Sequence, residues 1–223
     1  MTFSFHTYIK SILMTAVLGR TAVMIVFSMG VPNSVLADQA QPDMMAAELR
    51  IVRADLIRLD NDTALAPLHA QGLKMRIVGA LGVLPWLLLQ DGDDVGAERL
   101  RGWTIKMLGH RAERARLVRQ LDMAIMRHPL NRSLYSTDHL TISSKREARA
   151  IHETYCAGCH DDVGQGDADT LLPARDLYVM GGESTPEDFL ARLINGVKGD
   201  ETLLFSNPLT AQQITALWVL YRE

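Results

Sequence analysis

The sequence predicts an all-α protein, and three observations support this. Apolar side chains recur every three or four residues, for example at Leu49, Val52 and Leu56, which is the spacing of one helix face. Helix-start signals precede such runs, most clearly at Thr185-Pro186, where a capping threonine is followed by proline at the first helical position. The alternating apolar and polar pattern of a half-buried strand does not occur in the sequence.

The N-terminal part is expected to form a helical, bundle-like domain over residues 38–130. Its helices are predicted to run up to Asn61-Asp62, over 64–90 as a kinked or double helix, and over 95–127 as one long helix. His128-Pro129 should end the last of these, because proline disfavours helix in the residue before it. The apolar run over 77–89 is interrupted by Pro85 and is shorter than a bilayer core requires, so we expect a buried core helix there.

A polar linker over 131–143 is expected to lead into a second helical domain over 144–223. Ser144 and Glu147 have the spacing of a capping box, which predicts that a helix begins there. That helix should continue into Cys156, and Thr210 should cap a final helix near the C-terminus.

The balance of basic and acidic residues changes close to the predicted start of the second domain. Residues 38–149 carry 17 basic and 14 acidic side chains, whereas residues 150–223 carry 4 basic and 12 acidic side chains. This break favours two domains with different surfaces and argues against nucleic acid as a partner of the acidic part, since phosphate would be repelled. A group of arginines within 95–127 is predicted to form a solvated helix face or to dock against an acidic surface: Arg111, Arg114, Arg116 and Arg119.

The N-terminus has the pattern of a secretory signal peptide. Lys10 and Arg20 are the only Lys, Arg, Asp or Glu residues in the first 37 positions, and an apolar stretch over 21–31 is followed by Val35-Leu36-Ala37. This pattern predicts cleavage after Ala37 and export to the periplasm, with no stable membrane span afterwards. The alternative is an uncleaved membrane anchor, although the stretch covers only about half of the ~20 residues that a bilayer core needs.

The two cysteines of the chain lie in the segment Cys156-Ala157-Gly158-Cys159-His160. Cys-x-x-Cys-His is the attachment signature of c-type haem. Thiols one helical turn apart can add to the two vinyl groups of one porphyrin, and the histidine beside the second thiol then lies under the ring. The motif predicts one covalent haem c, attached through Cys156 and Cys159, with His160 as the proximal iron ligand.

Three other uses of a cysteine pair fit the sequence less well. A structural zinc site usually has four Cys or His ligands, and the chain contains no second cysteine pair. A thioredoxin-like dithiol would be expected next to a βαβ pattern, which the sequence lacks. A plain disulfide of an exported protein is the third alternative.

With this motif, residues 144–223 resemble the class I c-type cytochrome family, over about a third of the chain. A helix enters the motif, Pro173 follows His160 by thirteen residues, and the segments TPEDFLARLINGV and LTAQQITALWVLYR are similar to the later helices of the family. The resemblance implies that the Pro173 carbonyl holds the second ring nitrogen of His160. It also implies that Arg175 either approaches a haem propionate or is an ordinary surface arginine.

The resemblance further implies that the last helix crosses the motif helix at Ala148 and His152. His152 is therefore expected to be an interface side chain and not an iron ligand.

The family usually takes its second iron ligand from a methionine in the loop before the last helix. Here that loop, 197–208, contains neither methionine nor histidine. Met180, Lys198 or a side chain of the N-terminal domain could replace it, or the position could be open or hold water behind Leu203 and Leu204. The N-terminal candidates are His110, His128, His139, Met123 and Met126.

These features predict a mono-haem cytochrome for periplasmic electron transfer, with redox partner proteins that present a basic docking surface. The alternative is a small-ligand binding or sensor protein with an open iron position, for NO, CO or peroxide. Catalysis by this chain alone is not expected, because nothing supplies the distal histidine and arginine of a peroxidase.

Overall fold

A computed structural model describes residues 34–161, 170–196 and 207–223, with side chains from Asp43 onward. These residues belong to one compact unit, which spans 33–223. Every regular element in the described ranges is a helix, which confirms the all-α prediction. The α-helices are α1 (Ser34–Asn61), α2 (Pro67–Gln90), α3 (Asp94–Leu100), α4 (Ile105–Leu108), α5 (Arg111–Arg127), α6 (Ile142–Ile151), α7 (Ala157–His160), α8 (Leu177–Glu183), α9 (Pro186–Asn195) and α10 (Ala211–Leu220).

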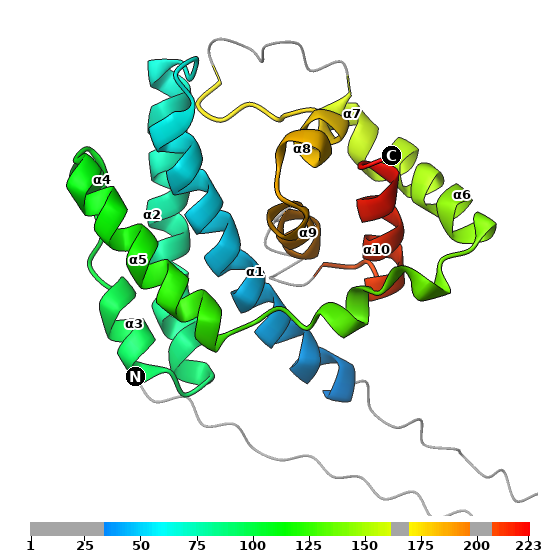
Figure 1. Ribbon diagram of the computed structural model, residues 1–223, viewed down its shortest axis with the longest axis horizontal. Coiled ribbons are helices and arrows are strands. Elements are labelled where there is room, and N and C mark those ends of the chain that lie inside the picture. Colours follow the sequence, from blue (N-terminus) through cyan, green and yellow to red (C-terminus); the bar gives the residue numbers. More distant parts are fainter. Residues whose placement is uncertain (1–33, 162–169, 197–206) are drawn as a thin grey trace, which may run out of the picture. The chain divides into compact units, whose positions relative to one another are not determined.

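Helix α1 lies at the centre of the packing. It contacts α2 and α5 on one side and α9 on the other, and Figure 1 shows it running diagonally between the two groups of helices. Seventeen buried residues from α1 to α5 form the first core cluster, in which Leu49, Leu56 and Leu84 are fully enclosed. Burial of a leucine side chain contributes roughly 1.5–3 kcal/mol, so this cluster alone can hold the N-terminal helices together.

Two further core clusters bring together parts of the chain that are far apart in sequence. Ala47 and Ile51 of α1 pack with Leu190 and Ile194 of α9, across the predicted domain boundary. The other cluster joins α6, α8, α9 and α10 around the fully buried Phe189. The linker predicted over 131–143 contains short 3₁₀ helices at Arg132–Tyr135 and Thr137–His139, and Tyr135 is buried in the cluster that joins α1, α9 and α10. Contacts therefore continue across the predicted linker.

A buried carboxylate joins three helices at this junction. Asp55 of α1 is 2% exposed. Arg192 of α9 donates to one of its oxygens at 2.7 Å, and Arg76 of α2 donates to the other. Burial and the neighbouring Arg192 guanidinium lower the pKa of Arg76 to about 10. The buried Glu48 also acts on both guanidiniums and raises their pKa values. Asp55 is the carboxylate that both arginines bond, so its loss would remove a hydrogen-bonded partner from each of these largely buried charges.

The long helix predicted over 95–127 is wrong in one respect, since the chain breaks twice within it. Gly102 adopts a positive φ of 76° between α3 and α4, a conformation that glycine tolerates and other residues rarely adopt. Thr104 then caps α4 by accepting a hydrogen bond from the Met107 amide, and α5 starts at Arg111. The predicted end at His128-Pro129 is confirmed, because α5 ends at Arg127.

The predicted kinked or double helix over 64–90 is a single helix, α2, which contains Pro85. Within the described residues α2 is the one helix long and apolar enough to cross a membrane, and 44% of its most apolar stretch is buried in the fold. Leu84 and Leu88 belong to the core, whereas Val83 and Trp86 are exposed. The helix predicted to lie in the core is thus buried on one side, while part of it is exposed.

The cap predicted at Ser144 is placed three residues too late. Helix α6 begins at Ile142, and its N-cap is Thr141, whose hydroxyl accepts from the Ser144 amide. Ser144 supplies the reciprocal bond of the capping box to the Thr141 amide. The caps at Thr185 and Thr210 are confirmed, since each hydroxyl accepts from the amide three residues later.

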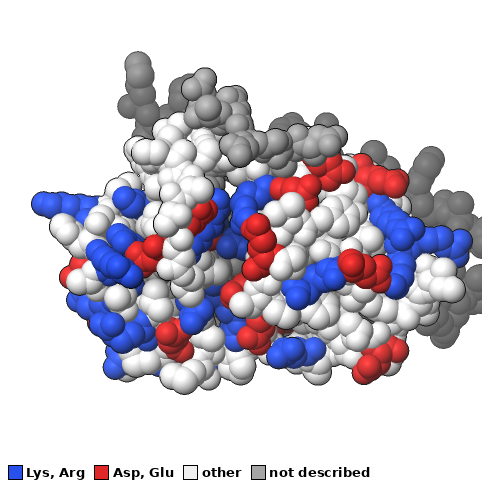
Figure 2. Space-filling model, turned by 45° about the horizontal axis from the view of Figure 1, so that its top comes forward, with Lys and Arg blue, Asp and Glu red and all other residues white. Residues whose placement is uncertain are grey.

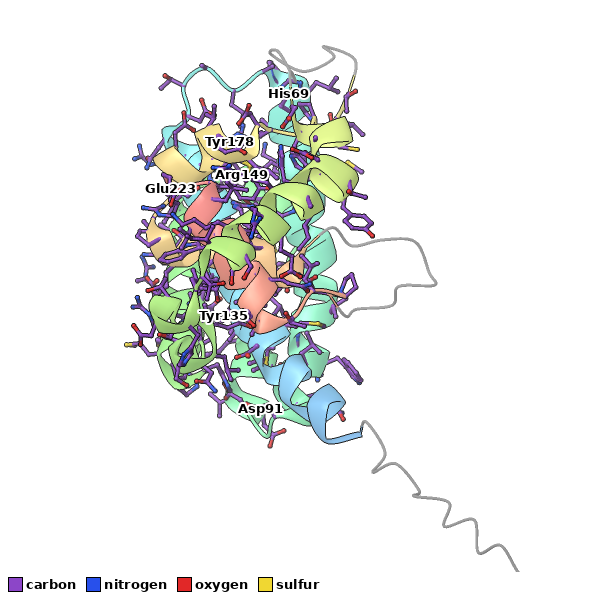
Figure 3. The ribbon with its side chains drawn as sticks, turned by 90° about the vertical axis from the view of Figure 1, so that its right-hand side faces the viewer. His69, Asp91, Tyr135, Arg149, Tyr178 and Glu223 are labelled. Carbon is purple, nitrogen blue, oxygen red and sulfur yellow. The ribbon has the colours of Figure 1, made fainter. Side chains whose placement is uncertain are left out.

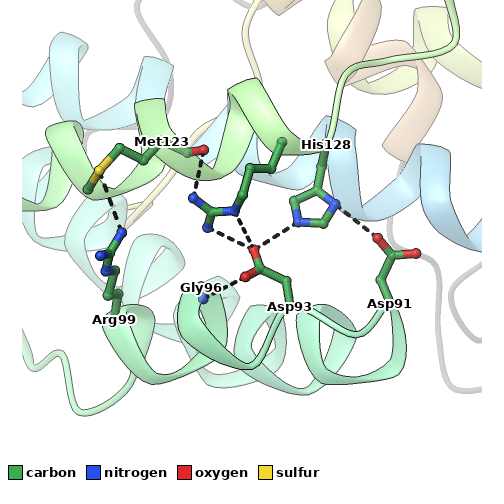
Figure 4. A network of polar contacts seen from close by, with 7 residues as sticks. Asp91, Asp93, Gly96, Arg99, Met123 and His128 are labelled. Carbon is green, nitrogen blue, oxygen red and sulfur yellow. Dashed lines mark hydrogen bonds and ion pairs between the residues drawn. The ribbon is translucent and has the colours of Figure 1, made fainter.

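A polar network holds the start of α3 against the end of α5 (Figure 4). One oxygen of Asp93 accepts from the Gly96 amide at 2.8 Å and thereby caps α3. The other lies 2.7 Å from Arg127 and 2.9 Å from His128. Burial would raise the pKa of Asp93, but these hydrogen bonds outweigh it and lower the pKa to about 2.

Figure 2 shows basic side chains gathered over the α3–α5 side of one face, and more acidic ones at the upper edge of the other side. Two of the α5 arginines contact other side chains of the fold, so the predicted solvated face is incomplete. Arg114 is half-buried and donates to Asp60 of α1, and Arg116 lies over the Trp103 ring at 4.8 Å.

We predict that Asp55→Asn lowers the free energy of unfolding by about 3–5 kcal/mol, because it removes the one carboxylate that both Arg76 and Arg192 bond. Asp122→Asn is the control. It removes a more exposed ion pair with Arg53 and should cost about 0–1 kcal/mol. Urea unfolding of both variants measures the difference, and equal losses would contradict the role of Asp55.

We predict that Asp93→Asn lowers stability at neutral pH by roughly 2 kcal/mol. Asparagine keeps the helix cap, so the loss reports the charge. Because the folded pKa lies below the unfolded value, the contribution is present above about pH 4 and disappears as pH falls through about 2. Urea unfolding from pH 7 to 2 should therefore show wild type and variant converging, while a constant difference would contradict this. Asp94→Asn, in the exposed first turn, serves as control.

Candidate functional site

The Cys-x-x-Cys-His segment lies where α6 changes its helical register. The chain passes from α6 into a π-helix over His152–Cys156 and then into α7. The Ala157 amide donates to the carbonyl of His152, five residues earlier, which defines the wider turn. Single π turns inside α-helices often occur at functional sites. Cys156 is half-buried and Cys159 exposed, and both are free thiols.

His160 is oriented by a backbone carbonyl. Its Nδ1 lies 2.6 Å from the carbonyl oxygen of Arg175. Since a carbonyl can only accept, Nδ1 carries the proton and Nε2 keeps its lone pair. This is the tautomer that a metal-ligating histidine needs. The prediction that Pro173 supplies this carbonyl is corrected: the acceptor is Arg175, two residues further along.

The Arg175 side chain has a protein partner of its own. Its Nη2 donates to Glu183 at 2.6 Å, and the guanidinium is about one-third exposed. Burial and the nearby charge of Arg58 lower the pKa of Arg175, Glu183 raises it, and the more distant charge of Arg192 lowers it again. A contact with a haem propionate would have to compete with Glu183 and stays a prediction.

These residues fit a covalently attached haem better than a metal ion alone. The donor set consists of two free thiols and one imidazole whose Nε2 is available. Within the described residues no three His, Cys, Asp or Glu side chains are grouped as a metal ion would require.

His152 has both ring nitrogens engaged. Nδ1 lies 2.9 Å from the Tyr221 hydroxyl, and Nε2 lies 3.1 Å from Asp161. The side chain is 6% exposed and sits where α6 and α10 cross, beside the fully buried Ala148. The predicted crossing is present, and His152 occupies the interface role that was expected for it.

Met180 does not have the surroundings of an iron ligand. It lies in α8 and is buried in the core cluster that contains Leu177, Phe189 and Tyr221. Its thioether therefore packs in the hydrophobic interior. The distal role proposed for Met180 has no structural support.

The N-terminal candidates for the second ligand are engaged or exposed. His128 binds Asp91 and Asp93 through both nitrogens (Figure 4), and the Met123 sulfur lies 3.6 Å from Arg99. Exposed side chains at the surface make up the rest: His110, His139 and Met126. Lys198, Leu203 and Leu204 lie outside the described residues.

One feature that the sequence did not reveal is the contact between α2 and the segment that comes after the motif. At Gly72 a Cβ atom would lie 2.0 Å from the Leu171 carbonyl oxygen, so only glycine fits. One turn earlier, His69 has a buried Nε2 with no hydrogen-bond partner. Figure 3 shows His69 at the end of the molecule where α7 lies. The sequence around Gly72 does not signal its contact with Leu171, because the two residues are far apart in the chain.

Residues 171–175 thus connect α2 to the ring of His160. They touch α2 at Gly72 and reach the Nδ1 edge of His160 through the Arg175 carbonyl. His69 lies one turn from Gly72, on the helix that contacts this segment.

Comparisons with family models, curated proteins and solved structures gave no match to this chain. Function is therefore inferred from the residues themselves.

We predict that Gly72→Ala destabilises the protein by about 1–3 kcal/mol, because the new methyl group overlaps the Leu171 backbone. Gly79→Ala on the same helix is the matched control. A Cβ there meets no atom within 4 Å, so removing a helical glycine should stabilise by about 0.5–1 kcal/mol. Thermal unfolding of the two variants should show opposite shifts, and the same sign for both would contradict the contact.

Proposed function

We propose that the chain is a mono-haem c-type cytochrome that transfers electrons outside the cytoplasm. The observation that carries this proposal is the bond of His160 Nδ1 to the Arg175 carbonyl, in the same turn as two free thiols. A histidine of an ordinary solvated helix end would have no need of a fixed tautomer, whereas an iron-ligating histidine does.

Each residue of the motif would have a distinct task. Cys156 and Cys159 would hold the porphyrin through thioether bonds, and His160 would ligate the iron through Nε2. The Arg175 carbonyl would keep the imidazole in one orientation and make Nε2 a stronger ligand by accepting the hydrogen bond from Nδ1–H. A bound haem would supply a one-electron couple at the iron.

The charge distribution supports an electron carrier that docks on a basic partner. The segment 150–223 holds 12 acidic side chains against 4 basic ones. Complementary charge accelerates encounter between redox proteins and orients them. Export of residues 38–223 by the signal pattern over 1–37 would place the protein in the periplasm, where covalent haem attachment takes place.

A second candidate is a protein that binds a small ligand at an open iron position. It is favoured by the state of the second-ligand candidates, since among the described residues Met180 is in the core and His128 is bonded at both nitrogens. An open position permits binding of CO or NO, whereas a strong second ligand suits electron transfer.

The proposal is tested on the exported protein, produced from the full sequence. The mass of wild type should exceed that of the polypeptide by one haem, and alkaline pyridine should give the haemochrome spectrum of a c-type haem. Cys156→Ala and Cys159→Ala should each retain a single thioether, and His160→Ala should lose the native ferric spectrum. A wild-type mass equal to that of the bare polypeptide would overturn the proposal.

The second ligand is tested by optical spectra of the ferrous protein before and after CO. We expect Met180→Leu to leave the spectrum unchanged, because Met180 packs in the core and leucine conserves its volume. A six-coordinate wild-type spectrum that CO does not alter supports the electron carrier. Avid CO uptake by wild type supports the ligand-binding candidate.

A further inference from the structure

The two cysteines of the motif have different surroundings. Cys159 is exposed, whereas Cys156 is half-buried and packs against the cluster that contains Tyr221. The Tyr221 hydroxyl lies close enough to the Cys156 thiol to lower its pKa, against the larger effect of burial. One thiol is thus held by the fold, and the other is free.

The contact of Cys156 is the end of a buried chain of hydrogen bonds. The Tyr221 hydroxyl lies 2.9 Å from His152 Nδ1, and His152 Nε2 lies 3.1 Å from Asp161. His152 and Tyr221 are 6% and 2% exposed. Asp161 directly follows the motif, so the chain starts and ends on the segment that carries the thiols.

Asp161 determines which atom donates in each of these hydrogen bonds. A carboxylate can only accept, so in neutral His152 the proton is on Nε2 and Nδ1 is an acceptor. The Tyr221 hydroxyl then donates to Nδ1, and Tyr221 is the member of these bonds that lies beside the Cys156 thiol. Burial raises the pKa of Cys156, and the Tyr221 hydroxyl lowers it by a smaller amount.

A contact between α6 and α10 that served only to pack the two helices would not need these hydrogen bonds. An apolar side chain at position 152 would fill the interface between α6 and α10 without a hydrogen-bond requirement. A buried imidazole instead needs both partners, and loss of either leaves an unsatisfied polar group. Only the contact with Cys156 connects this arrangement to chemistry.

We propose that Asp161, His152 and Tyr221 are positioning residues that aim the Cys156 thiol for haem attachment. The inference rests on the proposed function. In the attachment step the Cys156 sulfur forms a bond to one vinyl carbon, the vinyl π bond is lost, and the thiol hydrogen ends on the neighbouring vinyl carbon. The electrons balance within this addition, so no oxidant or reductant is required. Cys159, which is exposed, does not depend on the chain.

The test compares the two thiols separately in the exported protein, produced from the full sequence. In a Cys159→Ala background attachment depends on Cys156, and in a Cys156→Ala background it depends on Cys159. Tyr221→Phe should lower the haem-bearing fraction in the first background about two- to tenfold, the factor expected for one lost hydrogen bond. It should leave the second background unchanged. Peptide mass spectrometry counts the thioether at each cysteine.

Tyr178→Phe is the matched control. The Tyr178 ring contacts His152 and Tyr221 edge-on at 5.4 and 5.0 Å, and its hydroxyl has no hydrogen bond to any described residue. It should therefore change attachment in neither background. His152→Phe, which keeps an aromatic ring in the interface, should reproduce the selective loss at Cys156.

The possible outcomes are distinct. A selective loss at Cys156 in Tyr221→Phe supports the inference. An equal loss in both backgrounds would indicate a general structural role for Tyr221 and overturn it, as would an unchanged fraction in both. Absence of haem from the unsubstituted chain would instead overturn the proposed function itself.

Discussion

The fold depends on the side chain of Asp55. It is buried on α1, and it accepts from Arg76 of α2 and Arg192 of α9, so a single carboxylate connects the N-terminal helices to the helices that come after the motif. A buried ion pair of this kind adds little net stability compared with apolar packing, but it allows few alternatives. If α9 shifted by one turn, Arg192 would lose Asp55 and remain charged in the interior. The charges therefore specify how α9 lies on α1, while the surrounding apolar clusters supply most of the stability.

This junction explains why the sequence predicted the elements better than their assembly. The caps at Thr185 and Thr210 and the end at His128-Pro129 were found because they depend on neighbouring residues. The contact between Asp55 and Arg192 joins residues 137 positions apart, and no local pattern signals such a pair. The break at Gly102 was missed for a related reason, since Leu100, Trp103 and Met107 keep a helical spacing across it.

The candidate site likewise contains residues that the sequence identifies and contacts that only the tertiary structure reveals. Cys156, Cys159 and His160 can be identified from spacing alone, because the chemistry of attachment needs that order. The carbonyl partner of His160 was expected near Pro173 and lies at Arg175, since the exact residue depends on how the chain turns after Pro173. The support of this turn by Gly72 could not be predicted, because it comes from a helix far earlier in the chain. The sequence supplies the reactive groups, and the tertiary structure supplies their orientation.

The π turn and the buried histidine have a common physical consequence. A π turn places one extra residue between α6 and α7, which rotates α7 relative to the face of α6 that contacts α10. His152 opens that turn and Cys156 closes it, so the bonds from His152 to Tyr221 and Asp161 fix the direction in which the motif leaves α6. An α-helix without such bonds would favour the regular register, because the wider turn has poorer intrinsic stability. These hydrogen bonds thus stabilise the local geometry of the turn that ends at Cys156.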